Sequence, residues 1–242
     1  MTDRPSPGSG GGLSAVASPD SARVRVAGAF SLVCLCLCLV MLVLSSFAYP
    51  GGSWADKSAE GFEPLVNYWC DLMRTEAVNG LPNATSAALA KSAFGALAAS
   101  LSVYWWVAAS LLTSARLARW GIASGVLASV SVVLMLVLPY DTQPRLHAVT
   151  TLSAGGFGFL ATLFIMVGSL RSGAIARWRH AWGAALLVAA IANIVVYADI
   201  VLRDNRDSAT LPVIQKFGTL FFALWMTATV LATRSDRRKS PD

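Results

Sequence analysis

The stretch VAGAFSLVCLCLCLVMLVLSSFA, residues 26–48, decides the fold class because it carries no charged side chain. A helix needs about 20 consecutive apolar residues to cross the hydrocarbon core of a bilayer. Five further runs are long enough, at residues 92–113, 120–139, 148–170, 181–201 and 212–233. Membrane-spanning strands would be about half as long and would alternate between apolar and polar residues, which these runs do not. The sequence therefore predicts an all-α, polytopic membrane bundle of six transmembrane helices.

The overall composition leads to the same fold class. The chain is 55% hydrophobic and 13% charged, with a mean hydropathy of +0.59, whereas about a quarter of the residues of a soluble domain are charged. The formal net charge is +6, but the basic residues lie between the apolar runs instead of forming one basic face. We therefore expect the lipid bilayer as a partner and no nucleic acid.

The distribution of charge predicts the orientation of the chain. Of the 19 Lys and Arg residues, twelve fall on the side that holds both termini and seven on the other, while most acidic residues fall on the second side. Because cytoplasmic loops carry an excess of Lys and Arg, both termini are predicted to be cytoplasmic and the first loop to face outward. The high content of Ala, Val and Arg indicates a bacterial source, and hence a multi-pass protein of the inner (cell) membrane.

Three parts follow from these runs. Residues 1–25 are rich in Gly, Ser and Pro and are predicted to be a disordered cytoplasmic tail. Residues 26–233 form the transmembrane domain, and residues 234–242 form a basic cytoplasmic tail. The first apolar run could instead be a signal peptide cleaved after Ala48, but its length and the tail before it favour an uncleaved helix.

The first outer loop, residues 49–91, opens with YPGGSWADKSAEGFEPLVNYWCDLMRTEAVNGLPN. Pro64 suits the first turn of a helix and Asn79-Gly80 suits the end of one, so a short interfacial helix is predicted between them. Asn67 and Asp71 share one side of that helix at a spacing of four residues. We expect the loop to be a folded lid on the outer face, with both side chains pointing into the bundle rather than to water.

Polar groups near the outer helix ends make a candidate site, because an ionisable residue at membrane depth is by default a functional candidate. The candidates for acid and base catalysis are Asp71, Asp141 and His147. The candidates for binding a substrate or a lipid head group are Asn67, Arg74, Asp199 and Lys216. The plainer alternatives are a structural ion pair between Asp199 and Lys216, and a capping or interfacial role for His147.

The cysteines and histidines do not form a metal site. Three cysteines lie inside the first apolar run, where their alternate spacing does not put them on one helical face. Cys70 stands alone in the outer loop and is either a free thiol or half of an intermolecular disulfide. The second histidine, His180, falls on the opposite side of the membrane from His147. We expect no metal and no cofactor.

Small residues predict where helices touch in a membrane. Gly121 and Gly125 form such a pattern in the third run. The segment SAGGFGFL, residues 153–160, looks like a phosphate-binding loop, but no strand precedes it. Its glycines are therefore predicted to let two helices pack closely.

Several short motifs occur together in this chain. They are YPGG, Asp56, GFEPLVNYWCDL and NGLPN in the first outer loop, Asp141 and His147 in a later loop, and LPVIQKFG at the start of the last helix. With these motifs the chain resembles a bacterial family of six-helix integral membrane proteins of unknown function, over about residues 26–233. The resemblance implies the six-span fold, with Asn67, Asp71 and His147 as shared polar positions, and it implies no reaction.

Three functions are compatible with this sequence. The first is a structural or interaction role, in which the outer loop docks a membrane protein partner. The second is a membrane-embedded enzyme that acts on lipid or envelope substrates, including lipid head groups, at the outer leaflet. The third is a small-solute carrier or sensor, which the lack of charge in the middle of the spans makes weaker.

Overall fold

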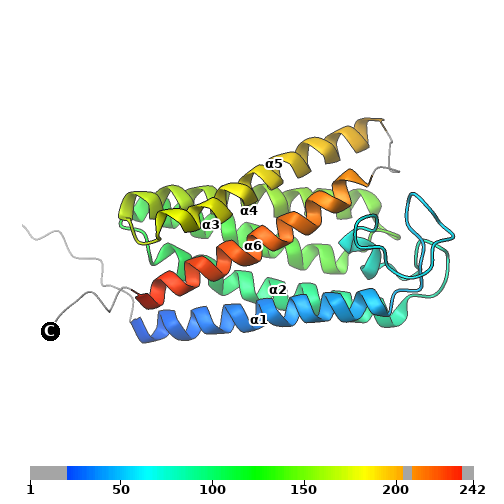
Figure 1. Cartoon of the computed structure of the whole chain (residues 1–242), viewed down its shortest axis with the longest axis horizontal. Coiled ribbons are helices and arrows are strands. Elements are labelled where there is room, and N and C mark those ends of the chain that lie inside the picture. The colour runs from blue at the N-terminus through cyan, green and yellow to red at the C-terminus, as the bar shows by residue number, and fades with distance from the viewer. Residues whose placement is uncertain (1–20, 204–208, 236–242) are drawn as a thin grey trace, which may run out of the picture.

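A computed structural model describes residues 21–203 and 209–235, and it confirms the all-α fold. Six helices are long and apolar enough to cross a membrane. They are α1 (Ser21–Phe47), α2 (Ala84–Ala109), α3 (Ala115–Val137), α4 (Pro144–Ser172), α5 (His180–Arg203) and α6 (Thr210–Ser235). Figure 1 shows them side by side along one long axis, with the start of α1 and the end of α6 at the same end.

Most of the predicted spans begin later than the helices do. Helix α1 begins at Ser21 and α2 at Ala84, so residues 21–25 belong to a helix and the outer loop ends before residue 91. The remainder of the predicted N-terminal tail, and residues 236–242 of the C-terminal tail, lie outside the described residues. Five residues between α5 and α6, 204–208, lie outside them as well.

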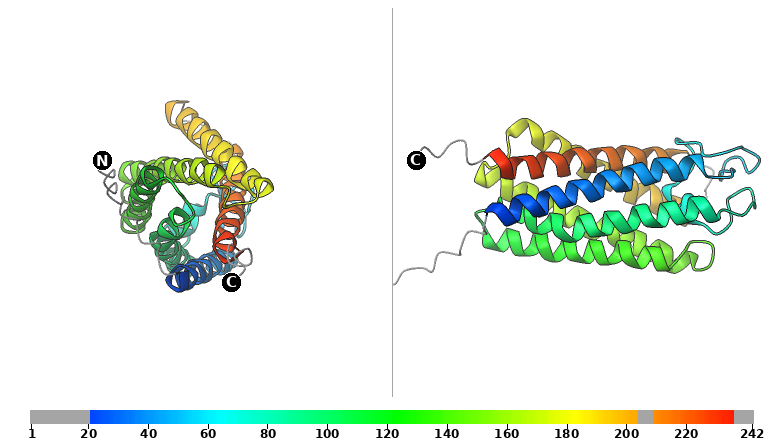
Figure 2. Two further views of the ribbon diagram at one scale, coloured as in Figure 1. Left: turned by 90° about the vertical axis from the view of Figure 1, so that its left-hand side faces the viewer. Right: turned by 90° about the horizontal axis from the view of Figure 1, so that it is seen from below.

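The helices do not contribute equally to the bundle. Seen from the end, α1, α2, α3, α4 and α6 surround a common centre, and α5 leans away from them (Figure 2). In the most apolar part of α5 only 11% of residues are buried, against 50% in α2. Helix α5 packs mainly on α6 and less on α4. The outer end of α5 therefore forms a wall beside the bundle instead of part of its core.

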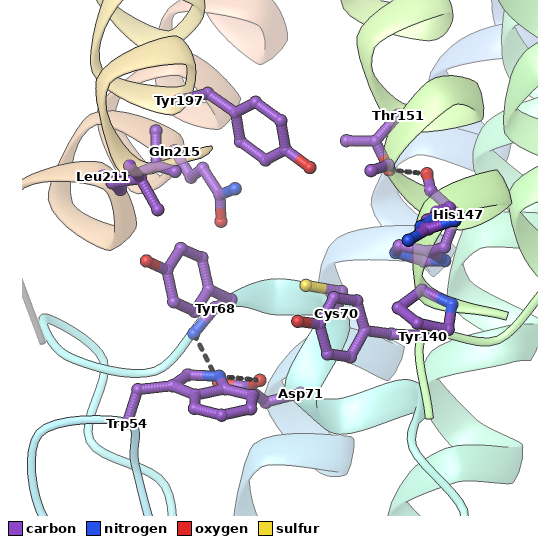
Figure 3. A pocket seen from close by; sticks show the side chains of 14 residues that line it. Trp54, Tyr68, Cys70, Asp71, Tyr140, His147, Thr151, Tyr197, Leu211 and Gln215 are labelled. Carbon is purple, nitrogen blue, oxygen red and sulfur yellow. Dashed lines mark hydrogen bonds between the residues drawn. The ribbon is translucent and has the colours of Figure 1, made fainter. Parts of the chain in front are cut away.

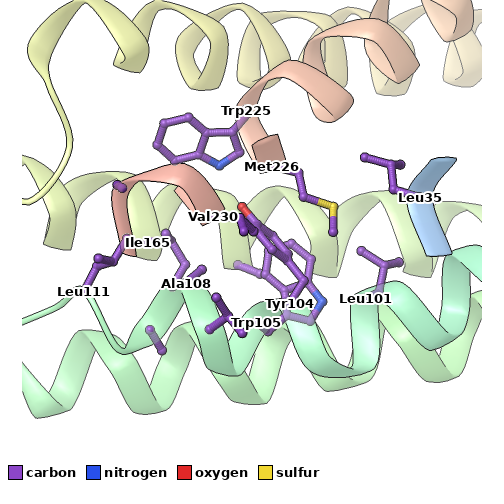
Figure 4. Close-up of a cluster of buried hydrophobic side chains, with 14 of the residues drawn as sticks. Leu35, Leu101, Tyr104, Trp105, Ala108, Leu111, Ile165, Trp225, Met226 and Val230 are labelled. Carbon is purple, nitrogen blue, oxygen red and sulfur yellow. The ribbon is translucent and has the colours of Figure 1, made fainter. Parts of the chain in front are cut away.

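Close helix contacts follow from small residues, as predicted for Gly121 and Gly125. A Cβ atom added at Gly121 would lie 2.9 Å from Ile165 of α4, and one at Gly125 would lie 2.1 Å from the ring of Trp105 of α2. Both distances are shorter than side chains tolerate, so these glycines let α3 approach its two neighbours. The cluster of buried side chains that results is shown in Figure 4, where Trp105 lies among side chains of α2, α4 and α6.

The glycines of residues 153–160 behave differently, and the prediction that they pack two helices together is wrong. A Cβ atom added at Gly155, Gly156 or Gly158 would meet no other atom within 4 Å. These glycines bring no element close. They leave space beside α4, which matters for the interior of the bundle.

The outer loop, residues 48–83, folds into a compact cap over one end of the bundle (Figure 1). The predicted short helix is present only as a five-residue 3-10 helix, η1 (Trp69–Met73). It does not present one polar and one apolar side, because Asp71, Leu72 and Met73 are all buried. A 3-10 turn of this length is set by its contacts with the surrounding chain rather than by helical periodicity.

Candidate functional site

Two glycines determine how the chain enters the cap. Gly51 and Gly52 have φ angles of 138° and 82°, which favour glycine. A Cβ atom at Gly51 would lie 2.4 Å from the carbonyl oxygen of Ala59, and one at Gly52 would lie 2.3 Å from the amide nitrogen of Asn79. The backbone at Gly51 and Gly52 therefore passes close to the backbone at Ala59 and at Asn79, with no room for a side chain. The polar residues of the cap pack against this part of the chain.

Asn67 and Asp71 hold the cap together from within, and both are buried, with exposed fractions of 0% and 2%. The Asn67 side chain donates to the carbonyl oxygen of Gly52 over 2.7 Å and accepts from the amide of Glu63 over 2.8 Å. The Asp71 carboxylate accepts from the amide of Tyr68 over 2.8 Å. Both side chains are buried rather than exposed to water, as predicted, but their hydrogen-bond partners belong to the cap and not to the helix bundle.

The remaining oxygen of Asp71 accepts from the indole nitrogen of Trp54 over 3.2 Å, as Figure 3 shows. Burial raises the pKa of this carboxyl, while hydrogen bonds from Tyr68, Asn67 and Trp54 oppose that rise. The hydrogen bonds of Asp71 therefore go to cap residues. This arrangement fits a residue that positions the cap rather than a free acid or base.

Three contacts tie the cap to helix ends that are distant in sequence. The carboxylate of Asp141, between α3 and α4, accepts from both the amide, over 2.8 Å, and the hydroxyl of Thr75. Burial acts to raise the pKa of Asp141, but the bonds from Thr75 outweigh it and the pKa is lowered. The indole of Trp69 donates to the hydroxyl of Thr219 on α6 over 3.2 Å. Asp141 is thus a tether for the cap.

Lys216 makes the third contact. Its ammonium group donates to the carbonyl oxygen of Asn67 over 2.7 Å and lies 4.2 Å from the ring centroid of Trp69. This hydrogen bond goes to the cap backbone and not to Asp199, the partner that the charge pattern predicted. A half-buried cation between a carbonyl oxygen and an aromatic face is stabilised without a carboxylate.

Beneath the cap lies a cavity of about 360 Å³, which we call the outer pocket. Its lining comes from the cap, the start of α4, the end of α5 and the start of α6: Trp54, Tyr68, Cys70, Asp71, Tyr140, Pro144, Arg145, His147, Ala148, Thr151, Tyr197, Ile200, Leu211 and Gln215. Figure 3 shows Tyr197 and Gln215 on one side and Tyr140 and His147 facing them from the other. Four aromatic side chains thus surround a volume large enough for a small ligand.

His147 is the most informative residue of the outer pocket. Only 4% of its surface is exposed, and its Nδ1 lies 2.8 Å from the carbonyl oxygen of Leu138. Because a carbonyl oxygen only accepts, Nδ1 carries the hydrogen and the lone pair of a neutral imidazole is on Nε2. That Nε2 atom is buried and has no hydrogen-bond partner among the described residues. His147 therefore ties α4 to the end of α3, as the capping alternative expected, and also presents an unused acceptor.

Gln215 provides a second unused acceptor. Its amide oxygen is buried and, within the described ranges, has no hydrogen-bond partner. A buried polar atom without a partner costs about 1–3 kcal/mol, and here two such atoms belong to residues that line the same cavity. Two residues whose buried acceptors are unpaired within the described part of the chain therefore line the outer pocket.

Only part of the predicted site comes together. Of the seven candidate residues, Asp71 and His147 line the outer pocket, whereas Asn67, Arg74, Asp141, Asp199 and Lys216 do not. The guanidinium of Arg74 lies 5.6 Å from the ring centroid of Trp54 and 5.7 Å from that of Tyr140, so it supports the aromatic wall. Asp199 lies half-buried near the outer end of α5. A triad of Asp71, Asp141 and His147 around one cavity is not formed.

The aromatic residues of the outer pocket were missed as site residues. Trp54 donates to Asp71, and its ring makes an edge contact with Tyr140 at 6.1 Å between centroids. Tyr140 in turn makes an edge contact with His147 at 5.9 Å. The sequence signal that could have found them is the number of aromatic residues that fall close to the polar candidates at the outer end.

The outer pocket contains a thiol but no metal-binding cluster. Cys70 is a free cysteine in the structure, and burial raises its pKa to about 12, so the thiol stays protonated at neutral pH. Over the described part of the chain, no group of three or more His, Cys, Asp or Glu side chains could hold a metal ion.

Comparison of the chain with known protein families, with characterised proteins and with solved structures finds no match. The resemblance to a bacterial six-helix family therefore stays a prediction. The geometry of the outer pocket has to carry the functional argument.

Proposed function

We propose that this protein binds, in the outer pocket, a small molecule or head group that donates hydrogen bonds. The observation that supports this function is that two residues of one aromatic cavity, His147 and Gln215, each carry a buried acceptor without a partner among the described residues, Nε2 of His147 and the amide oxygen of Gln215. Hydroxyl and ammonium groups donate hydrogen bonds of this kind. The faces of aromatic rings also attract cations and accommodate flat apolar surfaces.

The hydrogen bonds of the carboxylates of Asp71 and Asp141 favour ligand binding over acid and base catalysis. Asp71 accepts hydrogen bonds from Trp54 and Tyr68, and Asp141 accepts two from Thr75. Both oxygens of Asp71 and Oδ2 of Asp141 therefore have structural partners that a substrate would have to displace. Oδ1 of Asp141 has no partner among the described residues, but Asp141 does not line the outer pocket. A carrier or sensor that recognises a head group needs no such displacement, and a docking role for the cap needs no pocket.

A second candidate function is an enzyme that acts on the bound head group of a lipid or envelope substrate. The specific observation is the lone pair of His147, which could accept a proton from a substrate hydroxyl as a general base. Turnover of a bound molecule that His147→Ala abolishes, while binding persists through Gln215, would support this alternative.

We propose that the cap faces outward from a bacterial inner membrane, with both termini in the cytoplasm. The excess of Lys and Arg at the end that holds the termini supports this orientation. In a variant without the native cysteines, Ser58→Cys in the cap should react with a membrane-impermeant maleimide on intact cells. Ala176→Cys, which is exposed at the opposite end, should not react. The reverse pattern would overturn the orientation.

Thermal unfolding of the purified protein tests the ligand. Glycerol and ethanolamine donate hydrogen bonds, and dimethoxyethane is an uncharged polar molecule that donates none. A ligand present at about 100 times its Kd raises the free energy of unfolding by about 2.7 kcal/mol. We expect the two donors to stabilise the protein and dimethoxyethane to leave it unchanged.

Two variants and a matched control complete this test. Gln215→Leu and His147→Ala should each lose the stabilisation by the donors, because each lacks one of the two acceptors. His180→Ala changes the other histidine, which lies at the far end of the bundle. Its side chain is only 7% exposed and is hydrogen-bonded to Ser169. It should keep the response. Stabilisation that survives in both pocket variants would overturn the proposed function.

A further inference from the structure

A second cavity lies among the six helices and is partly open to their surroundings, with a volume of about 300 Å³; we call it the bundle cavity. All six helices contribute to its lining, which is almost entirely apolar and includes Leu35, Leu97, Val132, Phe159, Leu187 and Phe222. Protein interiors are close-packed, and voids larger than a water molecule are few. A space of this size among aliphatic and aromatic side chains therefore calls for an apolar occupant.

Glycines create much of this space. Gly155 and Gly158 of α4 and Gly218 of α6 line the bundle cavity, and a Cβ atom added at any of them would meet nothing within 4 Å. Gly121 and Gly125, by contrast, are glycines because a neighbour occupies the space. The same residue type thus closes the bundle around Trp105 and keeps it open beside α4.

The bundle cavity begins where the outer pocket ends. On α5, Tyr197 lines the outer pocket and Asn193, one turn away, lines the bundle cavity. On α6, Gln215 lines the outer pocket and Gly218, three residues later, lines the bundle cavity. Since a helix rises 1.5 Å per residue, these linings are separated by only about 4–6 Å along the axis.

The cap and α4 share this boundary. Cys70 lines the outer pocket while its neighbour Trp69 lines the bundle cavity, and on α4 Thr151 is followed by Gly155. A polar, aromatic chamber thus lies next to an apolar one along three helices. That succession of surfaces matches a molecule with a polar head and a hydrocarbon tail.

We propose that the protein binds an amphiphile, with a donor-bearing head group in the outer pocket and an acyl or alkyl chain in the bundle cavity. This inference rests on the proposed function of the outer pocket, and it adds the chemical class of the ligand. The head group donates to His147 and Gln215, and the chain runs past Trp69 to lie against the glycines of α4 and α6. The ligand is therefore a lipid or a lipid-like molecule of the membrane in which the protein resides.

A chain-length series of 1-monoacylglycerols tests the inference, because these molecules share one hydroxyl-bearing head group. The full-length protein is held in amphipol rather than detergent, so that few competing alkyl chains are present. Binding is measured as bound mass by native mass spectrometry and as the shift of the unfolding temperature. We expect affinity to rise with chain length from glycerol upward and then to level off when the cavity is filled.

Gly158→Leu should fill the bundle cavity and abolish the gain with chain length, while glycerol still stabilises the protein. Gly156→Leu is the matched control, because Gly156 lies on the same helix, has equal room for a Cβ atom and does not line the cavity. It should bind as the unchanged protein does, and it reports whether a leucine here disturbs folding.

The outcomes separate the two proposals. Long-chain binding that is unaffected by Gly158→Leu, or affinity that does not depend on chain length, would overturn the chain site and leave the outer pocket intact. Chain-dependent binding that is lost in Gly158→Leu but unaffected by both His147→Ala and Gln215→Leu would keep the chain site and remove the head-group site. Loss in both sets of variants, with Gly156→Leu unchanged, supports the whole amphiphile site.

Discussion

The cap and the helix bundle both have buried side chains, but the cap buries several polar ones and the bundle buries mainly apolar ones. The cap buries Asn67, Asp71 and Asn83 and holds them with hydrogen bonds to nearby backbone and side-chain groups. The Asn83 amide nitrogen, for example, donates to the carbonyl oxygens of Leu72 and Arg74, while its side-chain oxygen has no partner among the described residues. The bundle buries small residues against large ones, as Gly125 against Trp105. The cap thus depends on individual polar pairs, whereas the bundle depends on shape. This difference decides which substitutions each region tolerates.

Asp71→Ala should have the largest effect. It removes the acceptor of the Trp54 indole and of the Tyr68 amide, which are two half-buried donors. We expect the free energy of unfolding of the cap to fall by about 3 kcal/mol, or more than a hundredfold in equilibrium constant. Limited proteolysis within residues 48–83 measures the opening of the cap. Glu60→Ala, which removes an exposed carboxylate of the same loop, should change it little; equal effects would mean that the cap is not held by Asp71.

The same carboxyl predicts a pH dependence with a definite sign. Burial raises the pKa of Asp71 above its ordinary value of 3.8, so the folded cap binds this proton more tightly than the unfolded chain. Stability from this group is present below the ordinary pKa and declines as pH rises toward the raised one. Asp71→Asn cannot titrate, so the decline should disappear from its unfolding curves measured at a series of pH values.

Alkylation of Cys70 measures how dry the boundary between the two regions is. With a pKa raised from 9.0 to about 12, its thiolate is about a thousandfold rarer at pH 8 than in an unfolded chain, so we expect iodoacetamide to react up to about a thousandfold more slowly. The assay uses a variant in which the cysteines of α1 are alanine, and the unfolded form of the same variant is the control. Equal rates in the two forms would show that the thiol is hydrated and ionises normally.

Gly125→Ala tests the bundle in the way that Asp71→Ala tests the cap. The added methyl group would overlap the Trp105 ring, and overpacking of this kind costs about 1–3 kcal/mol, partly offset by about 1 kcal/mol of helix propensity. We expect a net loss of about 1–2 kcal/mol in thermal unfolding. Gly156→Ala has free space around it and should be neutral or slightly stabilising; a loss as large as that of Gly125→Ala would contradict the role assigned to shape.

The two regions also differ in how much the sequence predicts. The helices follow from the length and apolarity of each run, because lipid leaves a segment such as residues 26–48 no other way to satisfy its backbone. The burial of Asn67 and Asp71 follows from their position on a loop over the bundle. The partners of Asp141 and Lys216 could not be predicted, since they bond Thr75 and Asn67, 66 and 149 residues away. The role of each glycine could not be predicted for the same reason, because the neighbouring helix decides whether the space beside the glycine is filled.

Lys216→Met should have the smallest effect of the three substitutions that test stability, and it probes the contact where cap and bundle meet. The change removes one charged hydrogen bond to the Asn67 carbonyl and the contact with the Trp69 ring, but it also relieves the burial of an ammonium group. We expect a net loss of about 1 kcal/mol, visible as faster hydrogen exchange of cap amides. Lys57→Met, on the exposed surface of the cap, is the control. If exchange instead accelerates throughout α6 and the cap together, the two regions unfold as one unit and the contrast between them does not extend to their stability.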